Sequence, residues 1–385
     1  MLTRALAQTL RDAKKSFLLL GPRQTGKSTL VSSLNPDLSI NLAHEPTYLE
    51  FARNPRELEE RLNALSSGAK TQNIFIDEVQ RLPSLLNTVQ ALLDGDPRRY
   101  KFFFTASSAR KLRRGQANLL PGRIFTYRLG PVVSREMAYR LDTTEALSHG
   151  TLPGILFEPD LKTKEKTLTS YAATYLKEEV QAEALTRNLE GFARFLSICT
   201  EYAGQFLDLS KMAADSHIAR QTAVRYFEVL EDCLIVNRLT AFAKSARRRL
   251  VQHPRFYFFD NGVLNGLLGN FNLSADRVGN LFEHLICNQI LSSAAALDQT
   301  IKLSAYRTEH GAEVDFVLDM KRETIAIETK ASRNIGARDL RGFDSFADYF
   351  GKPHRAVVLY LGAERRRIGA VEIFPWQEGL RELGL

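Results

Sequence analysis

The sequence predicts an α/β protein of several domains, and three observations carry this prediction. A glycine-rich segment at 21–28 lies between a short apolar run and a helical pattern. A second apolar run, at 73–76, ends in a pair of acidic residues. Two alternating segments, at 313–318 and 325–330, follow in the last third of the chain. A chain of 385 residues is long enough for two or three domains.

The composition is that of a globular protein, with 44% hydrophobic and 25% charged residues, and does not indicate disorder. The apolar run before the glycine-rich segment is too short for a signal peptide, and no stretch approaches the roughly 20 apolar residues of a membrane span. The cysteines lie far apart, which favours a reducing compartment and argues against a zinc site. We therefore expect a soluble, cytoplasmic protein with no membrane partner. The three cysteines are Cys199, Cys233 and Cys287.

The chain is basic, with a net charge of +8 and a pI near 9.3, which permits a nucleic-acid partner. Positive runs occur at 110–114, 244–249 and 365–367. Any one run is typical of a solvated surface. Three on one chain make binding to a phosphate backbone an equally good interpretation.

The first element is a helical pattern over 1–15, with Leu2, Leu6, Leu10 and Ala13 on one stripe. A strand at 17–20 follows, and the next residues have the spacing Gly-x-x-x-x-Gly-Lys-Ser. This spacing is the P-loop pattern, and its place between a strand and a helix is the context that the pattern requires. We therefore expect a nucleotide-binding loop.

The residue types of this loop suit a phosphate. Gly21 and Gly26 let the backbone turn so that successive N–H groups face one centre, where the following helix adds its positive dipole end. Lys27 can reach the β- and γ-phosphates and the Ser28 hydroxyl can bind Mg²⁺, so ATP and Mg²⁺ are the expected cofactors. The predicted nucleotide-binding residues are Gly21, Pro22, Arg23, Gln24, Thr25, Gly26, Lys27, Ser28 and Thr29.

The second half of the predicted site follows a short strand at 40–42 and a helix that begins near Asn54. At the end of the strand 73–76, Asp77 is expected to hold Mg²⁺ through water, and Glu78 to polarise the attacking water as a general base. The alternative is a strand that ends at a polar turn. Ligands of parallel sheets collect at the carboxyl ends of strands, which favours the functional interpretation.

A helix over 82–93 and a further strand at 100–104 come next. This strand ends in polar residues that can touch the γ-phosphate or the attacking water: Ser107 is the candidate we carry forward, with Ser108 and Thr105 as alternatives. Ordinary hydrogen bonding at a strand end explains the same residues equally well.

After a helix over 109–120, an arginine precedes the strand 124–129. An arginine at this edge of the domain can enter a neighbouring subunit's site and stabilise transition-state charge, as an arginine finger does. Arg123 is the first candidate, and Arg113 and Arg114 are the second. The default interpretation of each is a surface residue.

These motifs together resemble the bacterial and archaeal AAA+ ATPases that carry a C-terminal domain of unknown function, DUF4143. The resemblance rests on Gly-Pro-Arg-Gln-Thr-Gly-Lys-Ser, Ile-Asp-Glu-Val-Gln-Arg-Leu-Pro, Thr-Ala-Ser-Ser-Ala-Arg and Leu-Pro-Gly-Arg, and covers essentially the whole chain. It implies a P-loop αβα core over 1–140, a helical lid over 141–205 beginning near the turn 149–154, and homo-oligomerisation, for example as a hexameric ring. A tyrosine stripe at 171–175 within the lid is interpreted as core.

The segment 206–252 has the pattern of a winged helix: a helix from Ser210, a second over 220–231, and a strand at 234–239. Such helices can contact phosphates and base edges, or serve in packing and oligomer contacts. The positive run at 244–249 would fall in the wing, which favours DNA as the partner. The predicted DNA-binding residues are Arg220, Arg225, Arg247, Arg248 and Arg249.

The segment 253–385 carries a D…E-x-K pattern and resembles the restriction-endonuclease-like superfamily. With a period of two, Glu328 and Lys330 point to one face of their strand. The resemblance implies that Asp315 and Glu328 hold Mg²⁺, that Lys330 orients the water, and that Glu283 completes the metal shell. The alternative is a pair of amphipathic strands with ordinary charges, since fold does not fix function.

Two functions follow from these expectations. The first is an ATP-hydrolysing AAA+ protein that acts on DNA through the winged helix and the nuclease-like domain, as a motor, a remodeller or an ATP-coupled nuclease. The second is a nucleotide-operated oligomeric switch, whose C-terminal domain is catalytically silent and binds a protein.

Overall fold

The computed structural model describes residues 2–65, 71–108, 120, 122–171, 189–242, 254–321 and 323–385. The chain forms two compact units. The N-terminal unit comprises Met1–Gly130 with Asp232–Leu234, and the C-terminal unit comprises Pro131–Glu231 with Ile235–Leu385. Among the described residues, we find no helix with the length and apolar character needed to cross a membrane.

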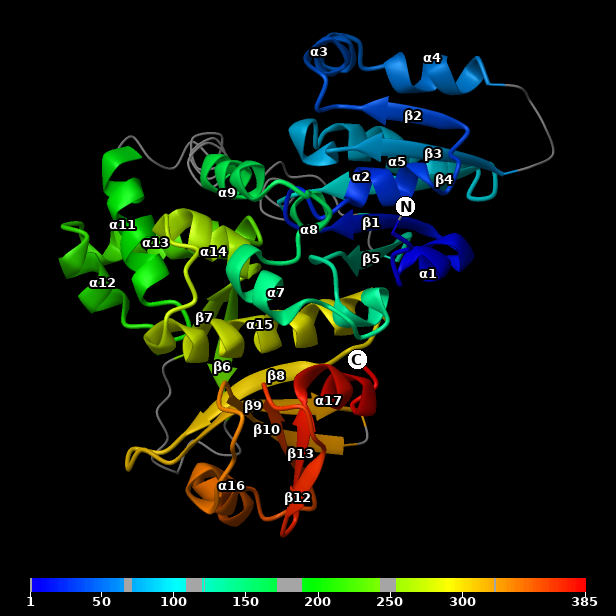
Figure 1. The fold of residues 1–385 in the computed structure, drawn as a ribbon. Coiled ribbons are helices and arrows are strands. Elements are labelled where there is room, and N and C mark those ends of the chain that lie inside the picture. Colours follow the sequence, from blue (N-terminus) through cyan, green and yellow to red (C-terminus); the bar gives the residue numbers. More distant parts are fainter. Residues whose placement is uncertain are drawn as a thin grey trace. The chain divides into compact units, whose positions relative to one another are not determined.

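The N-terminal unit is built on a parallel five-stranded sheet with the order β2-β3-β4-β1-β5 (Figure 1). Its strands are β1 (Ser16–Leu20), β2 (Leu38–Asn41), β3 (Gln72–Asp77), β4 (Tyr100–Ala106) and β5 (Ile124–Arg128). Its described helices are α1 (Ala7–Asp12), α2 (Lys27–Ser32), α3 (Glu45–Arg53), α4 (Glu57–Asn63), η1 (Val79–Arg81) and α5 (Leu85–Gly95).

Helices cover both faces of this sheet because its central strands are apolar on both sides. On β1, Phe17 and Leu19 pack in a cluster with α1 and α2, whereas Leu18 and Leu20 pack in a second cluster with α3, α4 and α5. Strands that are buried on both faces have continuous apolar runs, as the sequence 17–20 does. The carboxyl ends of β1, β3 and β4 therefore meet at one edge of a rigid layer.

The prediction of a helix over 1–15 is wrong in its extent. The structure confines it to α1, and β1 already begins at Ser16. The segment before α1 is instead held by the buried Arg4, whose guanidinium donates to the carbonyls of Thr25 and Gly130.

The C-terminal unit contains a mixed eight-stranded sheet with the order β12-β13-β11-β10-β9-β8-β6-β7. Its strands are β6 (Val236–Ala241), β7 (Arg255–Phe258), β8 (Lys302–Arg307), β9 (Glu313–Met320), β10 (Glu323–Lys330), β11 (Arg355–Tyr360), β12 (Arg366–Ile368) and β13 (Val371–Pro375). Its described helices are η2 (Ser134–Met137), α7 (Thr143–His149), α8 (Pro153–Leu156), α9 (Leu161–Ser170), α11 (Leu189–Glu201), α12 (Leu209–Asp215), α13 (Arg220–Asp232), α14 (Asn261–Leu268), α15 (Ala275–Ala296), η4 (Ala337–Leu340), α16 (Arg341–Phe350) and α17 (Trp376–Glu382).

The sheet joins two segments that the sequence suggests are separate. Strand β6, which follows the helix pair α12 and α13, pairs antiparallel with β7 and parallel with β8. Strands β9 and β10 form the expected antiparallel hairpin, and β10 continues into the parallel strands β11 and β13. The long helix α15 contacts both β7 and β10. Residues from α15, β7, β9 and β10 can therefore meet in one place.

Candidate functional site

The P-loop has the backbone shape that its glycines predict. Gln24 and Gly26 have positive φ angles of 62° and 88°. A side chain at Gly21 would place its Cβ 2.2 Å from the carbonyl oxygen of Leu129, so only glycine fits there. The loop can therefore turn at one end of β1 and present backbone N–H groups at the start of α2.

Lys27 lies folded over the loop. Its ammonium group donates to the carbonyl oxygens of Gly21 at 2.8 Å and Pro22 at 2.9 Å. The side chain is buried. The loop thus holds a cation at the place where a phosphate group would need one.

Ser28 and Asp77 come together across the sheet edge. The Ser28 hydroxyl donates to Asp77 Oδ1 at 2.8 Å, and the Thr105 hydroxyl donates to the same oxygen. The structure thus brings together the two residues that the sequence predicts to hold Mg²⁺. Mg²⁺ is bound in proteins by one or two carboxylates with substrate phosphates and water, and this pair of oxygen ligands fits that ion.

Glu78 follows Asp77 in a left-handed conformation, with φ of 55°. Its backbone N–H donates to Thr105 Oγ1 at 3.0 Å, and its carboxylate accepts from the Ser107 hydroxyl at 3.0 Å. The amide of Gln80 donates to the same carboxylate and to Ser107. Glu78 is therefore held in a fixed place beside the β4 strand end. Of the three alternatives at the end of β4, the Thr105 hydroxyl binds Asp77 and the Ser107 hydroxyl binds Glu78. The buried Ser108 hydroxyl has no hydrogen-bond partner among the described residues.

Two residues of this site were missed by reasoning from the sequence. Arg4 donates to the Thr25 carbonyl at 2.6 Å, which supports the loop from outside the motif. Gln80 lies two residues after Glu78 in the Asp-Glu-Val-Gln segment, and this proximity was the available signal. For Arg4 the sequence offers no such signal, because it lies 21 residues before its partner.

Arg123 forms an ion pair with an acidic residue of helix α5. Its guanidinium binds both carboxylate oxygens of Asp94 near the end of α5, at 2.6 and 3.0 Å. This arginine lowers the pKa of Asp94. The second-choice residues Arg113 and Arg114 lie outside the described residues.

In the C-terminal unit, two of the four predicted nuclease residues, Glu283 and Asp315, contact Arg255. Its guanidinium lies 2.7 Å from Glu283 Oε1 and 3.8 Å from Asp315 Oδ1. The Glu328 carboxylate instead accepts a hydrogen bond from the Lys330 ammonium group at 3.0 Å. The structure thus brings the predicted residues together, with an added cation that the sequence analysis did not assign.

Glu283, Glu313, Asp315 and Glu328 form an acidic group around this place, and burial raises the pKa of two of these carboxyls. Desolvation, with the nearby charge of Asp315, raises the pKa of Glu328 to about 9 and that of Glu283 to about 7. Lys330 partly offsets the shift at Glu328, and Arg255 partly offsets it at Glu283. Within the described part of the chain, no three His, Cys, Asp or Glu side chains are grouped so as to hold a metal ion.

The predicted DNA-binding residues are described only in part. Arg220 and Arg225 lie on the exposed side of α13, and Arg220 Nε donates to the Ser210 hydroxyl at 3.0 Å. Phe227 and Leu230 of the same helix are buried. Arg247, Arg248 and Arg249 lie outside the described residues.

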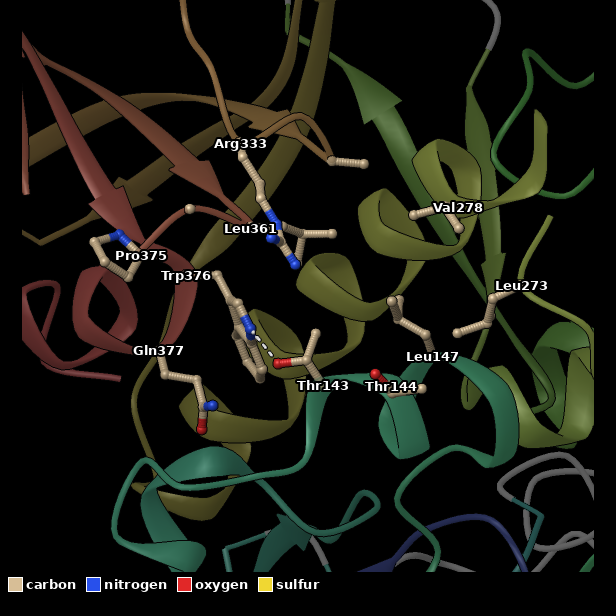
Figure 2. A pocket seen from close by; sticks show the side chains of 12 residues that line it. Thr143, Thr144, Leu147, Leu273, Val278, Arg333, Leu361, Pro375, Trp376 and Gln377 are labelled. Atoms are coloured by element: carbon tan, nitrogen blue, oxygen red, sulfur yellow. Dashed lines mark hydrogen bonds between the residues drawn. The ribbon is translucent and has the colours of Figure 1, made fainter. Parts of the chain in front are cut away.

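A cavity of about 410 Å³ opens at the carboxyl ends of β10, β11 and β13 (Figure 2). In Figure 2 the Arg333 side chain points toward Leu361, and the indole nitrogen of Trp376 donates to the Thr143 hydroxyl at 3.0 Å. None of the site residues predicted from the sequence lies among the described residues that line it.

Three protein families match successive parts of the chain. An AAA domain matches 13–138, a domain of unknown function, DUF8612, matches 140–274, and a second domain of unknown function, DUF4143, matches 278–378. Two similar proteins are the uncharacterized proteins Rv2008c of Mycobacterium tuberculosis and Mb2031c of Mycobacterium bovis. Each is 26% identical over 320 residues, which cover 81% of this chain and 69% of the relative.

Among solved structures, the chain is similar to a DNA polymerase III gamma subunit-related protein of Thermotoga maritima. The identity is 13%, the coverage is 59% of this chain and 98% of the other, and the TM-score is 0.28. It is also similar to a signal transduction ATPase with numerous domains from Pyrococcus horikoshii, at 11% identity, 74% and 44% coverage, and a TM-score of 0.25. The AAA match supports an ATPase. The chain carries an AAA domain followed by a C-terminal DUF4143 domain, which is the architecture that the sequence motifs resemble.

Proposed function

We propose that this protein is a Mg²⁺-dependent ATP hydrolase of the AAA+ type that acts on DNA. The observation that carries the proposal is the contact of Ser28 with Asp77 beside an anchored Glu78. A metal-binding hydroxyl, a metal-binding carboxylate and a base are the parts that P-loop hydrolysis needs, and all three lie at one sheet edge.

The roles follow from the chemistry of each group. The N–H groups of the loop bind the phosphates, and Lys27 exchanges the carbonyls of Gly21 and Pro22 for phosphate oxygens. Ser28 and Asp77 would hold Mg²⁺, and the ion would neutralise phosphate charge. Glu78 accepts a proton from the attacking water.

Positioning of that base falls to its neighbours. Ser107 and Gln80 both donate to the Glu78 carboxylate, which fixes its direction. General-base catalysis depends on the base lying within hydrogen-bond reach of the water, so these donors set the rate through Glu78. Arg123 is proposed as an arginine finger for a neighbouring subunit. It would exchange Asp94 for the transferring phosphate, which makes homo-oligomerisation part of the proposal.

The proposed DNA contact rests on the helix pair α12 and α13 with the β6–β7 hairpin. This order of elements is that of a winged helix, in which the second helix meets the DNA. Arg220 and Arg225 are exposed on that helix, and the whole chain is basic. We propose that these arginines, with Arg247, Arg248 and Arg249, bind phosphates of the duplex.

A nucleotide-operated oligomeric switch is the second candidate. It is favoured by the ion pairs of Arg255 within the acidic group, since these would keep the C-terminal domain catalytically silent. In that case the C-terminal domain binds a protein and DNA has no effect on ATP turnover.

The deciding experiment measures the ATPase rate in Mg²⁺ with and without duplex DNA, at low and at high salt, with the DNA followed on a gel. Stimulation that weakens steeply with salt supports action on DNA, because such contacts release counterions. Stimulation with cutting that is lost in Asp315→Ala indicates an ATP-coupled nuclease, and stimulation without cutting a motor or remodeller. Equal rates with and without DNA at low salt support the switch. Lys27→Ala is the control, since loss of turnover in this variant shows that the P-loop is the source of the measured activity.

A further inference from the structure

The acidic group of the C-terminal unit has an arginine at its centre. Arg255 begins β7 and is 6% exposed. Its guanidinium reaches Glu283 Oε1 at 2.7 Å, Glu313 Oε2 at 3.2 Å and Asp315 Oδ1 at 3.8 Å. These acids come from helix α15 and from strand β9, so the arginine joins two elements that are separate in the chain.

This guanidinium and a divalent metal would need the same space. A Mg²⁺ ion shared by Glu283 and Asp315 would lie about 2.1 Å from one oxygen of each. Arg255 Nη1 lies 2.7 Å from Glu283 Oε1 and 3.8 Å from Asp315 Oδ1, in the space that such an ion would take between these carboxylates. An arginine cannot give up its charge, so the two cations would also repel each other. Occupation by one excludes the other.

Other protein donors also bind oxygens of Asp315 and Glu283. Asp315 Oδ2 accepts from the backbone N–H and the hydroxyl of Thr329, both at 2.8 Å. The Tyr257 hydroxyl donates to Glu283 Oε1 at 2.5 Å. A metal ion bound to Glu283 Oε1 or to Asp315 Oδ2 would have to displace these donors.

Arg255 itself is held from several sides. It pairs with β6 through its backbone, opposite Leu239. The ring of Phe206 lies 4.7 Å from its guanidinium carbon, and the backbones of the two residues form a β-bridge. The side chain cannot leave the acids without losing both this stacking and its ion pairs.

We infer that Arg255 is the resident cation of this acidic centre, in place of a divalent metal. The centre formed by Glu283, Glu313 and Asp315 therefore binds no divalent metal, so Asp315 does not serve as the metal ligand of a nuclease. Removal of the guanidinium creates a divalent-cation site from these three residues. The inference rests on the proposed assignment of the C-terminal domain as nuclease-like, and it selects the motor, remodeller or switch over the nuclease.

The test is a calorimetric titration of the full chain with Mn²⁺ in the absence of nucleotide. An Asp77→Asn background removes the carboxylate of the P-loop site. In this background we expect no Mn²⁺ bound at millimolar concentration, and one Mn²⁺ per chain once Arg255→Ala is added. The new site should be lost again with Asp315→Asn. Arg238→Ala is the matched control. Arg238 lies on the neighbouring strand β6 and pairs with Glu231, and its removal should create no site.

Two results would overturn the inference. One is an Asp315-dependent Mn²⁺ bound while Arg255 is present. The other is a folded Arg255→Ala chain that binds none. If Arg255→Ala fails to fold, Arg255→Met is used in its place, because methionine keeps an apolar side chain against Phe206. The titration of the chain with Arg255 present still decides the first result. Because ATP turnover plays no part in this measurement, failure of the proposed ATPase or of its action on DNA would be seen separately.

Discussion

Replacing Arg4 tests whether the P-loop depends on support from outside its motif. Arg4→Met keeps most of the side-chain volume and removes the hydrogen bonds to the carbonyls of Thr25, at 2.6 Å, and Gly130, at 2.9 Å. A hydrogen bond to a charged group contributes about 1.5–3 kcal/mol, so the free energy of unfolding of the N-terminal unit should fall by at least ~3 kcal/mol. The Thr25 bond alone acts within the loop. Its loss of ~1.5 kcal/mol should weaken ATP binding roughly tenfold.

The assay combines thermal unfolding, followed by circular dichroism, with titration of a fluorescent ATP analogue. Arg11→Met is the matched control, because Arg11 is exposed on α1 and donates to the side chain of Gln8. We expect this control to match the parent in both measurements. A Kd for Arg4→Met within twofold of the control would refute the reasoning, since the loop would then keep its shape without the guanidinium.

Three further predictions follow from the described contacts. Glu78→Gln should still bind ATP but hydrolyse it at least roughly 10²-fold more slowly, because glutamine cannot accept the proton. Turnover at the parent rate, measured by phosphate release, would assign the base to another residue. Arg123→Ala should lower the ATPase rate by roughly 10³-fold if it acts as a finger, whereas Asp94→Asn, which breaks the same ion pair but keeps the arginine, should change it little; equal losses would make the ion pair the cause. Burial lowers the pKa of His284 to about 4, so the unfolded chain binds a proton near pH 5 that the folded chain does not, and stability falls as the pH drops from about 6.5 to 4. Between pH 7 and pH 4, the parent should lose ~3 kcal/mol more free energy of unfolding than His284→Gln, as measured by chemical unfolding. Equal losses in the two proteins would contradict this. Asp260, whose buried carboxyl has its pKa raised to about 6, has the opposite effect on stability, but it is present in both proteins and cancels in the comparison.

The nucleotide site could be predicted from the sequence because its parts are contiguous motifs. The positive φ angles of the loop require glycine or a tolerant residue, and Gly21 faces a carbonyl that excludes any side chain. Asp77 and Glu78 end an apolar strand, and a parallel sheet brings such ends together whatever lies between them. The pairing of Ser28 with Asp77 follows from these local rules, across a separation of 49 residues.

The boundaries of helices and strands were harder to predict, because local sequence patterns carry no information about tertiary contacts. The stripe over 1–15 has helical spacing, but Arg4 is drawn to two carbonyls of the nucleotide-binding unit and the helix begins at Ala7. The helix pair before β6 was predicted from its own pattern. The pairing of β6 with β8 depends on the register of strands that lie more than 60 residues apart in the printed sequence.

The sequence by itself determined the AAA domain, the DUF4143 domain and the residues of the P-loop, because residue type and short spacing dictate those features. The tertiary structure alone decided the character of the acidic centre. Asp315, Glu328 and Lys330 are at the spacing of a metal-dependent nuclease, but Arg255 precedes Asp315 by 60 residues and belongs to no motif. Its ion pair with Glu283 forms because the sheet places β7 beside β6 and α15 packs on β7. Long-range pairing of buried charges depends on the register of packed elements, which no local pattern encodes.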